Sequence, residues 1–429
     1  MGTDDAADVT IVSAHYAPEP TGNAPYSTSL ARELARRGRR VDAIAAQPFY
    51  PGWRIYEGYG AWTSREDDAG VELTRRRHYV PGRPTAIRRL LSETSFGLRV
   101  ALTRWRPAKV RVLVSPALFG TAVVLARAVV LDRGTPIVVW IQDLYGTGMR
   151  ETGAGGGAAA RIVSAVEGWV LRRATRVVVI HDRFAAAIER DYGVDPARID
   201  VVRNWTHLDE SVVPDRAAAR ATLGWGDGDV VAVHAGNMGV KQGLDTVVAA
   251  AARAEALGSR VRFVMVGDGS ERARLEEAAA GLSTIEFIGT LGDDEFRAAL
   301  HAADVLVVNE LPGVAEMSVP SKLTSYFATG RPVVAAVDPH GATADEIAGS
   351  GGGLVVPSGD PDALVEAIET LGGDAVLAHR LGESGLRFRR EVLSLDAAVT
   401  RFEEALARAG APLGAEAEDG APMRAGRAV

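Results

Sequence analysis

The 429-residue sequence predicts an α/β protein of two domains, each built on a doubly wound parallel sheet covered by helices. The chain is longer than a single hydrophobic core usually serves. Apolar runs typical of buried strands alternate with amphipathic helical stretches from residue 9 to about residue 408, as in parallel sheets with helical crossovers. This alternation stops in the irregular stretch 203–229 and then starts again, which indicates a second domain.

The first predicted domain, residues 1–204, opens with a strand at 9–13, a loop rich in Pro and Gly, and a helix over 26–37. Gly38 should end that helix, because glycine takes the left-handed conformation that often follows a helix C-terminus. A strand around 41–45 comes next. Later strands are expected at 110–113, 137–140 and 177–180.

The second predicted domain covers residues 205–390. Strands are expected at 230–234, 263–266, 285–288, 305–308, 333–337 and 353–356, with helices at 244–256, 270–279 and 293–301. A last element over 391–410 keeps Val399, Phe402 and Leu406 on one helical face, so it should pack against another part of the protein. The Ala/Gly/Glu/Pro-rich stretch 411–429 is expected to be disordered.

Composition excludes several classes of function. The absence of cysteine excludes disulfides, thiolate metal sites and a cysteine nucleophile. A net charge of −7 argues against general nucleic-acid binding. The acidic start has no basic or apolar signal region, which favours a cytoplasmic protein. The apolar stretch 112–131 is interrupted by Pro116, Gly120 and Arg127, and fits a strand followed by a helix better than a membrane span.

The segment 75–111 is strongly basic. It holds eleven Lys or Arg against a single acid, Glu93, with leucines and a phenylalanine between them. This pattern fits peripheral contact with an anionic membrane surface. A helix face solvated by arginines explains it too, and is the slightly favoured alternative.

Ligands of doubly wound sheets bind beyond the carboxyl ends of the strands, so the loops that follow the apolar runs are candidate sites. Gly22 and Asn23 follow the first strand and precede a helix, whose free amides suit a phosphate, although a plain turn is as good an explanation. The loop 236–243 combines three glycines with Lys241 at the matching position of the second domain, which suits a diphosphate.

Two more loops add weaker indications. Ser321 can cap the helix that begins near 321 and leads to Gly330, with free amides turned toward a ligand. Gly267-Asp268-Gly269 ends a strand and could border a base or ribose. Asp227 and Asp229 precede a strand, so their spacing indicates a turn rather than a metal site. We expect no metal and no bound cofactor.

In order along the chain, His15–Asn23, Gly236–Gly239, Val266–Gly269 and Pro320–Leu323 resemble the family 4 glycosyltransferases, most of all the colanic-acid and O-antigen sugar transferase branch. The resemblance covers roughly residues 9–408. It implies the GT-B fold of two facing Rossmann-like domains, a final helix that crosses back to the first domain, and transfer that needs no metal and retains the anomeric configuration.

The resemblance also implies roles for individual residues. The residues expected to contact the donor are Gly22, Asn23, Gly236, Asn237, Met238, Gln242, Gly267, Asp268, Gly269, Ile288, Pro320, Ser321, Leu323 and Ser325. Those expected to act in catalysis are Lys241, Lys322, Asp143 and Glu316. The two lysines would stabilise the leaving diphosphate, and Asp143 would lie near the acceptor, with a helix cap or turn as its plain alternative.

This sequence departs from the family pattern at several positions. Two glutamates with seven residues between them are usual, but Met317 and Ser325 stand where they should fall, and Glu316 or Glu346 could substitute. Asn237 replaces a usual arginine. Gln242 replaces a usual lysine, and Lys241 comes one place early.

The predicted function is retaining transfer of a hexose-type group from a UDP- or GDP-type nucleotide sugar. The acceptor is expected to be a lipid-linked saccharide or a small metabolite. A nucleotide-sugar epimerase of the same fold, and a non-catalytic subunit that binds nucleotide sugars, remain as alternatives.

Overall fold

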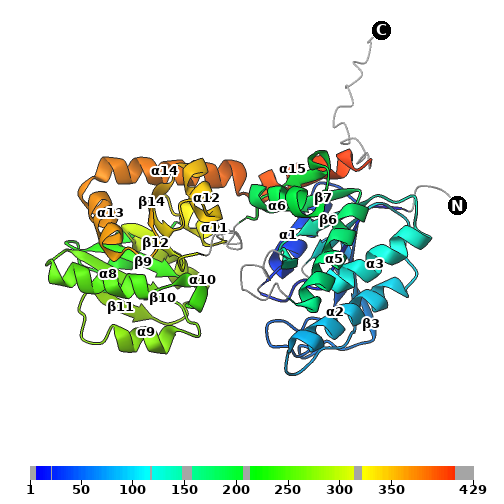
Figure 1. The fold of residues 1–429 in the computed structure, drawn as a ribbon, viewed down its shortest axis with the longest axis horizontal. Helices are drawn as coiled ribbons and strands as arrows, with labels where there is room; N and C mark the ends of the chain where they lie inside the picture. Colours follow the sequence, from blue (N-terminus) through cyan, green and yellow to red (C-terminus); the bar gives the residue numbers. More distant parts are fainter. Residues whose placement is uncertain are drawn as a thin grey trace, which may run out of the picture.

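The computed structural model describes residues 6–20, 22–115, 118–146, 157–205, 213–313 and 321–410. The described chain forms two halves, each with its own parallel sheet (Figure 1). The predicted boundary at 204/205 lies between the last strand of the first sheet, which ends at Val201, and the helix that begins at Arg216.

The first sheet has the strand order β3-β4-β2-β1-β5-β6-β7-β8, parallel except for the β3–β4 pair. Its strands are β1 (Ala7–Ser13), β2 (Val41–Ala46), β3 (Thr63–Asp68), β4 (Val71–Arg76), β5 (Ala108–Ser115), β6 (Ile137–Ile141), β7 (Arg176–Val179) and β8 (Ile199–Val201). The helices of this half are α1 (Ala24–Arg36), α2 (Ala86–Ala101), α3 (Leu118–Leu131), α5 (Ala158–Arg173) and α6 (Asp182–Tyr192), with a short 3-10 turn at Pro196–Arg198. The expectation of a strand followed by a helix over 112–131 is confirmed by β5 and α3.

The second sheet has the order β11-β10-β9-β12-β13-β14, entirely parallel. Its strands are β9 (Val230–Ala235), β10 (Val261–Val266), β11 (Ile285–Ile288), β12 (Val305–Asn309), β13 (Val333–Val337) and β14 (Gly353–Pro357). Its helices are α7 (Arg216–Leu223), α8 (Asp245–Ala256), α9 (Arg272–Ala278), α10 (Asp293–Ala302), α11 (Ser321–Phe327), α12 (Ala342–Ser350), α13 (Pro361–Gly373) and α14 (Ala375–Val392), with a 3-10 turn at Val240–Gln242.

Both sheets follow the Rossmann order, in which the chain starts at a central strand, builds to one side and then continues on the other. The first strand of each sheet therefore marks the point where the order reverses. Strands β1 and β9 are buried on both faces, because helices cover the two sides of each sheet. A ligand is expected outside the carboxyl ends of these strands.

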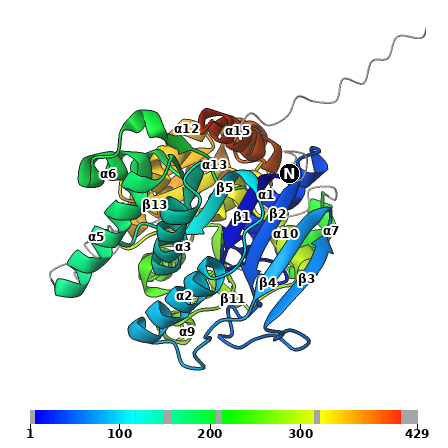
Figure 2. The same ribbon diagram turned by 90° about the vertical axis from the view of Figure 1, so that its right-hand side faces the viewer.

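The final helix α15 (Leu395–Arg408) packs on the first half, although α14 belongs to the second (Figures 1 and 2). Val399, Phe402 and Leu406 are buried in the core that lies against α1 and β1. Arg37 binds the carboxylates of Asp396 at 2.6 Å and Glu403 at 2.9 Å. The expected crossing of the chain end back to the first half is confirmed. Residues 411–429 lie outside the described residues.

Candidate active site between the two sheets

Two glycine loops at the carboxyl ends of β9 and β10 pack main chain against main chain. Gly236 and Gly267 have φ angles of +124° and +125°, which side chains rarely allow. A Cβ on Gly267 would lie 2.2 Å from the carbonyl oxygen of Gly236, and one on Gly269 would lie 2.4 Å from that of Met238. Only glycine fits at these positions, so the loops present peptide groups rather than side chains.

The loop 236–243 is clamped from β12. The side-chain amide of Asn309 donates hydrogen bonds to the carbonyls of Gln242 at 2.7 Å and Gly243 at 2.9 Å. The amide of Leu311 donates to the carbonyl of Lys241 at 2.9 Å. The side chain of Lys241 itself is exposed and forms no ion pair with any residue that the structure describes. A rigid backbone therefore presents a free ammonium group.

Lys322, in the first turn of α11, lies against the same loop. A Cβ on Gly236 would be 3.1 Å from the Lys322 side chain. Burial lowers the pKa of Lys322 to about 8, and the nearby carboxylate of Glu310 opposes this shift. The second lysine predicted for catalysis is therefore placed beside the glycine loop.

Lys322 is held by a buried histidine that sequence reasoning missed. The distance from its Nζ to Nε2 of His234 is 2.9 Å, and Nδ1 of His234 is 3.2 Å from the carbonyl oxygen of Val307. Because a carbonyl only accepts, Nδ1 carries the proton and Nε2 accepts from the ammonium. Burial, reinforced by the charge of Lys322, holds the pKa of His234 far below its usual value. His234 therefore acts as a neutral acceptor that orients Lys322.

Glu310 follows β12 directly and is buried. The hydroxyl of Thr343 donates to its carboxylate at 2.6 Å. Glu316, proposed as a replacement for the missing family glutamate, lies outside the described residues. Glu346, the other proposed replacement, faces Arg203 of the first half at 3.2 Å instead of the glycine loops. Glu310 is thus the described acid whose charge acts on Lys322. Its position directly after a predicted strand could have identified it from the sequence.

On the first sheet, Gly22 and Asn23 lie where β1 leads into α1. Gly22 has a φ of +66°. The side-chain amide of Asn23 donates to the carbonyl of Ser115 at 3.1 Å, which ties the end of β1 to the end of β5. These two strands flank the reversal of strand order, so both predicted residues lie where a ligand of such a sheet is expected.

Asp143 follows β6 on a pinned loop. Its neighbour Gln142 forms an amide pair with Asn204, at 2.9 Å and 3.3 Å. The carboxylate of Glu167 accepts from the amides of Tyr145 at 2.8 Å and of residue 146 at 2.9 Å. The side chain of Asp143 is reached by solvent, but many protein atoms lie around it. Desolvation by these atoms raises the pKa of Asp143 to about 6, and the charge of Lys241 opposes this shift. The charge of Lys241, on the second sheet, therefore acts on Asp143, on the first.

A second acid near Asp143 escaped the sequence prediction. Burial raises the pKa of Glu93, on α2, to about 7, against the amide of Phe119 and the charge of Arg89. The amide of Phe119 donates to its carboxylate at 3.2 Å. The charges of Glu93 and Asp143 both act on the half-buried Tyr145, whose pKa is raised first by desolvation and next by these acids. Glu93 could have been noticed in the sequence because it is the single acid of the basic segment 75–111.

Two residues predicted to contact the donor, Met238 and Leu323, are buried. Met238 is fully buried, its amide donates to the carbonyl of Asp268, and its carbonyl accepts from the amide of Glu271. Leu323 is buried beneath α11. Both fall inside motifs whose alternate positions face the core.

The remaining predicted donor residues fall into two groups. Asn237 and Asp268 are exposed, while Gln242, Ile288 and Ser325 are half-buried at the same end of the sheet. The side-chain oxygen of Gln242 accepts from the amide of Gly239 at 3.1 Å. Pro320 and the side chain of Ser321 lie outside what the structure describes.

Within the described ranges, no three His, Asp or Glu side chains are grouped to hold a metal ion. None of the described helices is long and apolar enough to cross a membrane.

The two facing Rossmann-like sheets and the returning C-terminal helix define the GT-B fold of glycosyltransferases. The chain superposes on sucrose-phosphate synthase from Thermosynechococcus elongatus with a TM-score of 0.72 and 19% identity, over 94% of this chain and 99% of the other. It also superposes on HepE of Anabaena, solved in complex with UDP, with a TM-score of 0.67 and 13% identity, over 93% and 99% of the two chains. These similarities establish the fold.

Sequence comparison gives the family. Residues 21–205 match the glycosyl transferase 4-like domain, and residues 229–374 match the glycosyl transferases group 1. The chain is 30% identical over 338 residues to WcaI of Escherichia coli strain K12, provisionally assigned as a colanic acid biosynthesis glycosyl transferase, covering 75% of this chain and 81% of that one. The chain belongs to the family 4 glycosyltransferases, enzymes that transfer a sugar from a nucleotide sugar.

Proposed function

We propose that this protein is a retaining, metal-independent hexosyltransferase that uses a UDP- or GDP-type nucleotide sugar and a lipid-linked saccharide acceptor at the cytoplasmic face of a membrane. The catalytic part is supported by the positions of Lys241, on a glycine loop fixed at the end of the second sheet, and Asp143, on a loop fixed at the end of the first, and by the effect of the Lys241 charge on Asp143. A cation and a carboxylate at the carboxyl ends of two facing sheets suit a donor diphosphate and an acceptor hydroxyl, respectively.

The second sheet is proposed to bind the donor. When the bond between the anomeric carbon and the diphosphate oxygen breaks, negative charge grows on the diphosphate. Lys241, Lys322 and the peptide groups of the glycine loops stabilise that charge without having to reorganise, which lowers the barrier. Because HepE was solved with UDP, UDP is the first nucleotide to test.

The first sheet is proposed to bind the acceptor. The acceptor oxygen bonds to the anomeric carbon on the face that the diphosphate leaves, so the configuration is retained. Its proton must go to a base, and Asp143, with a pKa of about 6, is ionised and close to the working pH. Glu93, on the same side, is placed to accept a hydrogen bond from a second hydroxyl of the acceptor.

The lipid-linked acceptor is favoured by the outer face of α2. Ile87, Leu91, Leu98 and Leu102 are 71%, 53%, 46% and 80% exposed. Their spacing places them on one side of the helix, within about 60° of each other at 100° per residue. This stripe is apolar but covered by no described element. Figure 2 shows α2 at the outer side of the first half, beside the edge strands.

The residues around this apolar stripe favour contact with an anionic membrane. Arg83, Arg88 and Arg104 are exposed beside it. Trp62 is 66% exposed, and the guanidinium of Arg99 lies 3.8 Å from its ring centre. Basic and aromatic side chains around an apolar helix face are typical of helices that lie in the membrane interface. This arrangement revises the preference for a merely solvated helix face.

The donor assignment is tested by calorimetric titration of the purified protein with UDP and GDP, without added metal. Micromolar binding of one nucleotide, lost in Lys241→Ala, supports it, whereas binding unaffected by that substitution contradicts it. NMR of the product then reports the anomeric configuration. Isomerisation of the nucleotide sugar without an acceptor would indicate an epimerase.

The acceptor assignment is tested by flotation with vesicles of phosphatidylglycerol and phosphatidylcholine. Wild type should float, and Leu91→Ser/Leu98→Ser should not. The matched control is Val130→Ser/Leu131→Ser, which removes two side chains, 58% and 71% exposed, at the end of α3. Equal flotation of both double variants, or full activity on a water-soluble acceptor without vesicles, would favour a small metabolite as the acceptor.

A further inference from the structure

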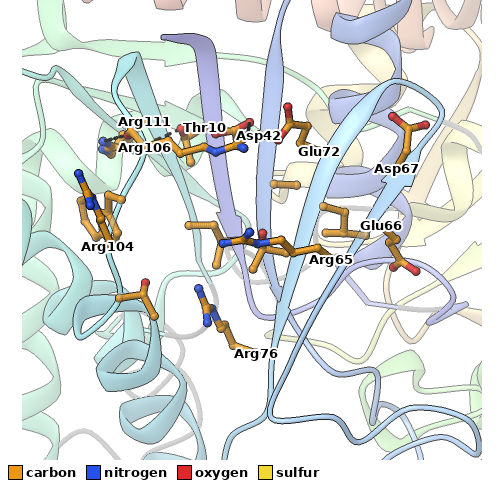
Figure 3. A pocket seen from close by; sticks show the side chains of 16 residues that line it. Thr10, Asp42, Arg65, Glu66, Asp67, Glu72, Arg76, Arg104, Arg106 and Arg111 are labelled. Carbon is orange, nitrogen blue, oxygen red and sulfur yellow. Dashed lines mark hydrogen bonds and ion pairs between the residues drawn. The ribbon is translucent and has the colours of Figure 1, made fainter. Parts of the chain in front are cut away.

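A charged hollow of about 330 Å³ lies on the first sheet, away from the proposed active site (Figure 3). Strands β1, β2, β3, β4 and β5 contribute to its walls, together with residues 103–106, which follow α2. Ile44 lines the hollow and also belongs to the core that contains Phe96 and Val100 of α2. The hollow is therefore on the same face of the sheet as α2, beyond its C-terminal end.

One part of the hollow is electrically balanced. Arg106 contacts the carboxylate of Glu72 and lies 3.7 Å from that of Asp42. Arg111 binds Asp132 at 2.7 Å and the hydroxyl of Thr10 at 3.2 Å. The upper part of the view in Figure 3 shows five of these residues: Thr10, Asp42, Glu72, Arg106 and Arg111. Their charges are already satisfied by each other.

The two other acids of the lining are also engaged elsewhere. Glu66 binds Arg75 at 2.6 Å, and Asp67 accepts from the amide of Gly70 at 3.2 Å. In Figure 3 the carboxylates of Glu66 and Asp67 point away from the hollow. They leave the lower part of the hollow without a negative charge that faces it.

Three arginines line the rest of the hollow: Arg65 of β3, Arg76 of β4 and Arg104 of the segment after α2. In Figure 3, Arg65 and Arg76 lie in its middle and lower part, and Arg104 lies at its left side. Arg65 and Arg104 form no ion pair with any residue in the described ranges. Arg76 donates to the hydroxyl of Thr63 at 2.7 Å, but its Nε–H is buried and has no partner among the described residues. Burial lowers the pKa of Arg76, and the like charges of Arg99 and Arg65 lower it further. An anion placed here would relieve that repulsion and satisfy the buried donor.

We propose that Arg65, Arg76 and Arg104 form a binding site for a phosphate group, and that the phosphate belongs to a membrane lipid. Arginine forks match phosphate oxygens in geometry as well as in charge. The hollow also joins the apolar stripe of α2, because the exposed Leu102 is followed directly by Thr103 and Arg104 of its wall. A lipid whose tails meet the stripe would bring its headgroup phosphate to these arginines.

This geometry separates membrane anchoring from catalysis. Helix α2 has 16 residues and spans about 24 Å at 1.5 Å per residue. Its N-terminal half carries Glu93 of the acceptor side, and the arginine site lies past its other end. A lipid held at the site would fix the enzyme on the membrane without occupying the acceptor position. The choice of a lipid rests on the proposed function, but the phosphate site does not.

The test compares Arg65→Gln/Arg104→Gln with Arg161→Gln/Arg173→Gln. The first pair removes two arginines of the site, and the second removes two exposed arginines of α5 in the same half, so the net charge falls equally. All four side chains are exposed, so both variants should fold. Binding is measured to phosphatidylcholine vesicles that contain either phosphatidic acid or phosphatidylserine at equal surface charge, and to glycerol 3-phosphate in solution. UDP binding is measured in parallel.

Wild type should prefer phosphatidic acid, and Arg65→Gln/Arg104→Gln should lose about 30-fold in affinity, the factor expected for two arginines at an anionic surface. The control variant should bind like wild type. Loss of glycerol 3-phosphate binding without an effect on vesicles would keep the site and assign it a soluble phosphate. Equal losses in both variants, or no preference for phosphatidic acid together with no glycerol 3-phosphate binding, would overturn the proposal. Intact UDP binding separates either failure from a failure of the donor assignment.

Discussion

The two sides of the proposed active site are built from different materials. On the second sheet, glycine loops pack so closely that no Cβ fits between them, and peptide groups with two lysines form the proposed donor side. On the first sheet, the site consists of side chains such as Asp143 and Glu93, from a loop and a helix far apart in the sequence. Many donors share a diphosphate, so a rigid site made of main-chain groups suits it. Acceptors differ from one another, and substitutions of side chains can adapt the other side of the site to them.

The largest expected effect is on the donor side, from Lys241→Met. Removing one preorganised group that stabilises developing charge costs about 10²–10³ in kcat. The measurement is steady-state kinetics with saturating donor and acceptor. The matched control is Lys109→Met, which removes a lysine that binds Asp8 at 2.7 Å, near the start of β1 and away from the carboxyl ends. If kcat fell by a similar factor in both variants, the loss of a positive charge, and not the position of Lys241, would explain the effect.

On the acceptor side, Asp143→Asn should lower kcat about 100-fold, the lower range for loss of a general base. Because the pKa of Asp143 is about 6, wild-type activity should fall as the pH drops below 6, and that acid limb should disappear in the variant. Donor binding, measured by titration with UDP, should stay within twofold. If UDP binding weakens as much as kcat, Asp143 belongs to the donor side and the comparison fails.

The same contrast explains what sequence reasoning could predict. The glycine loops could be predicted from the sequence because main-chain contact restricts the residue type at consecutive positions. Both sheets could be predicted because each strand is a short apolar run. The burial of Met238 and Leu323 could not be predicted, because a motif does not say which of its positions face the core. Glu93, His234 and Glu310 were missed because each becomes functional only through partners that are remote in the sequence, such as Phe119, Lys322 and Thr343.

A smaller effect is expected from Gly269→Ala. Its Cβ would come within 2.4 Å of the carbonyl of Met238, so the two glycine loops must separate. Overpacking of this kind costs about 1–3 kcal/mol of stability, and we expect at least a tenfold loss of UDP affinity as the cradle opens. Gly373→Ala is the control, because nothing lies within 4 Å of the added methyl group. UDP affinity unchanged in Gly269→Ala would mean that the cradle does not bind the nucleotide.

Lys322 should make activity and stability change in opposite directions as the pH rises above about 8. Activity should fall about tenfold per pH unit above about pH 8, because the protonated ammonium is the active form. The pKa of Lys322 in the folded state lies below its value in the unfolded chain. Between about pH 8 and the ordinary lysine pKa of 10.5 the unfolded chain therefore binds more protons, and this residue makes stability rise with pH. The difference between wild type and Lys322→Met, measured by urea unfolding and by kinetics, isolates both trends.

His234 supplies a test of how Lys322 is positioned. His234→Gln can keep an acceptor near Nζ of Lys322, whereas His234→Leu cannot. The leucine variant should therefore shift the alkaline limb of the kcat profile, and the glutamine variant should restore it in part. Identical profiles for both variants would reduce His234 to a packing residue.

The smallest effect is expected where the two halves touch. Arg183 of the first half binds Asp345 of the second at 2.6 Å, with side chains 27% and 51% exposed. Exposed pairs contribute about 0.2–1 kcal/mol, so Asp345→Asn should lower the free energy of unfolding by no more than about 1 kcal/mol and leave kcat within twofold. Urea unfolding at low and high salt checks this, since the difference from wild type should shrink as salt screens the pair. A tenfold change in kcat would instead show that this contact sets the distance between Lys241 and Asp143, and that the two sides of the site do not act independently.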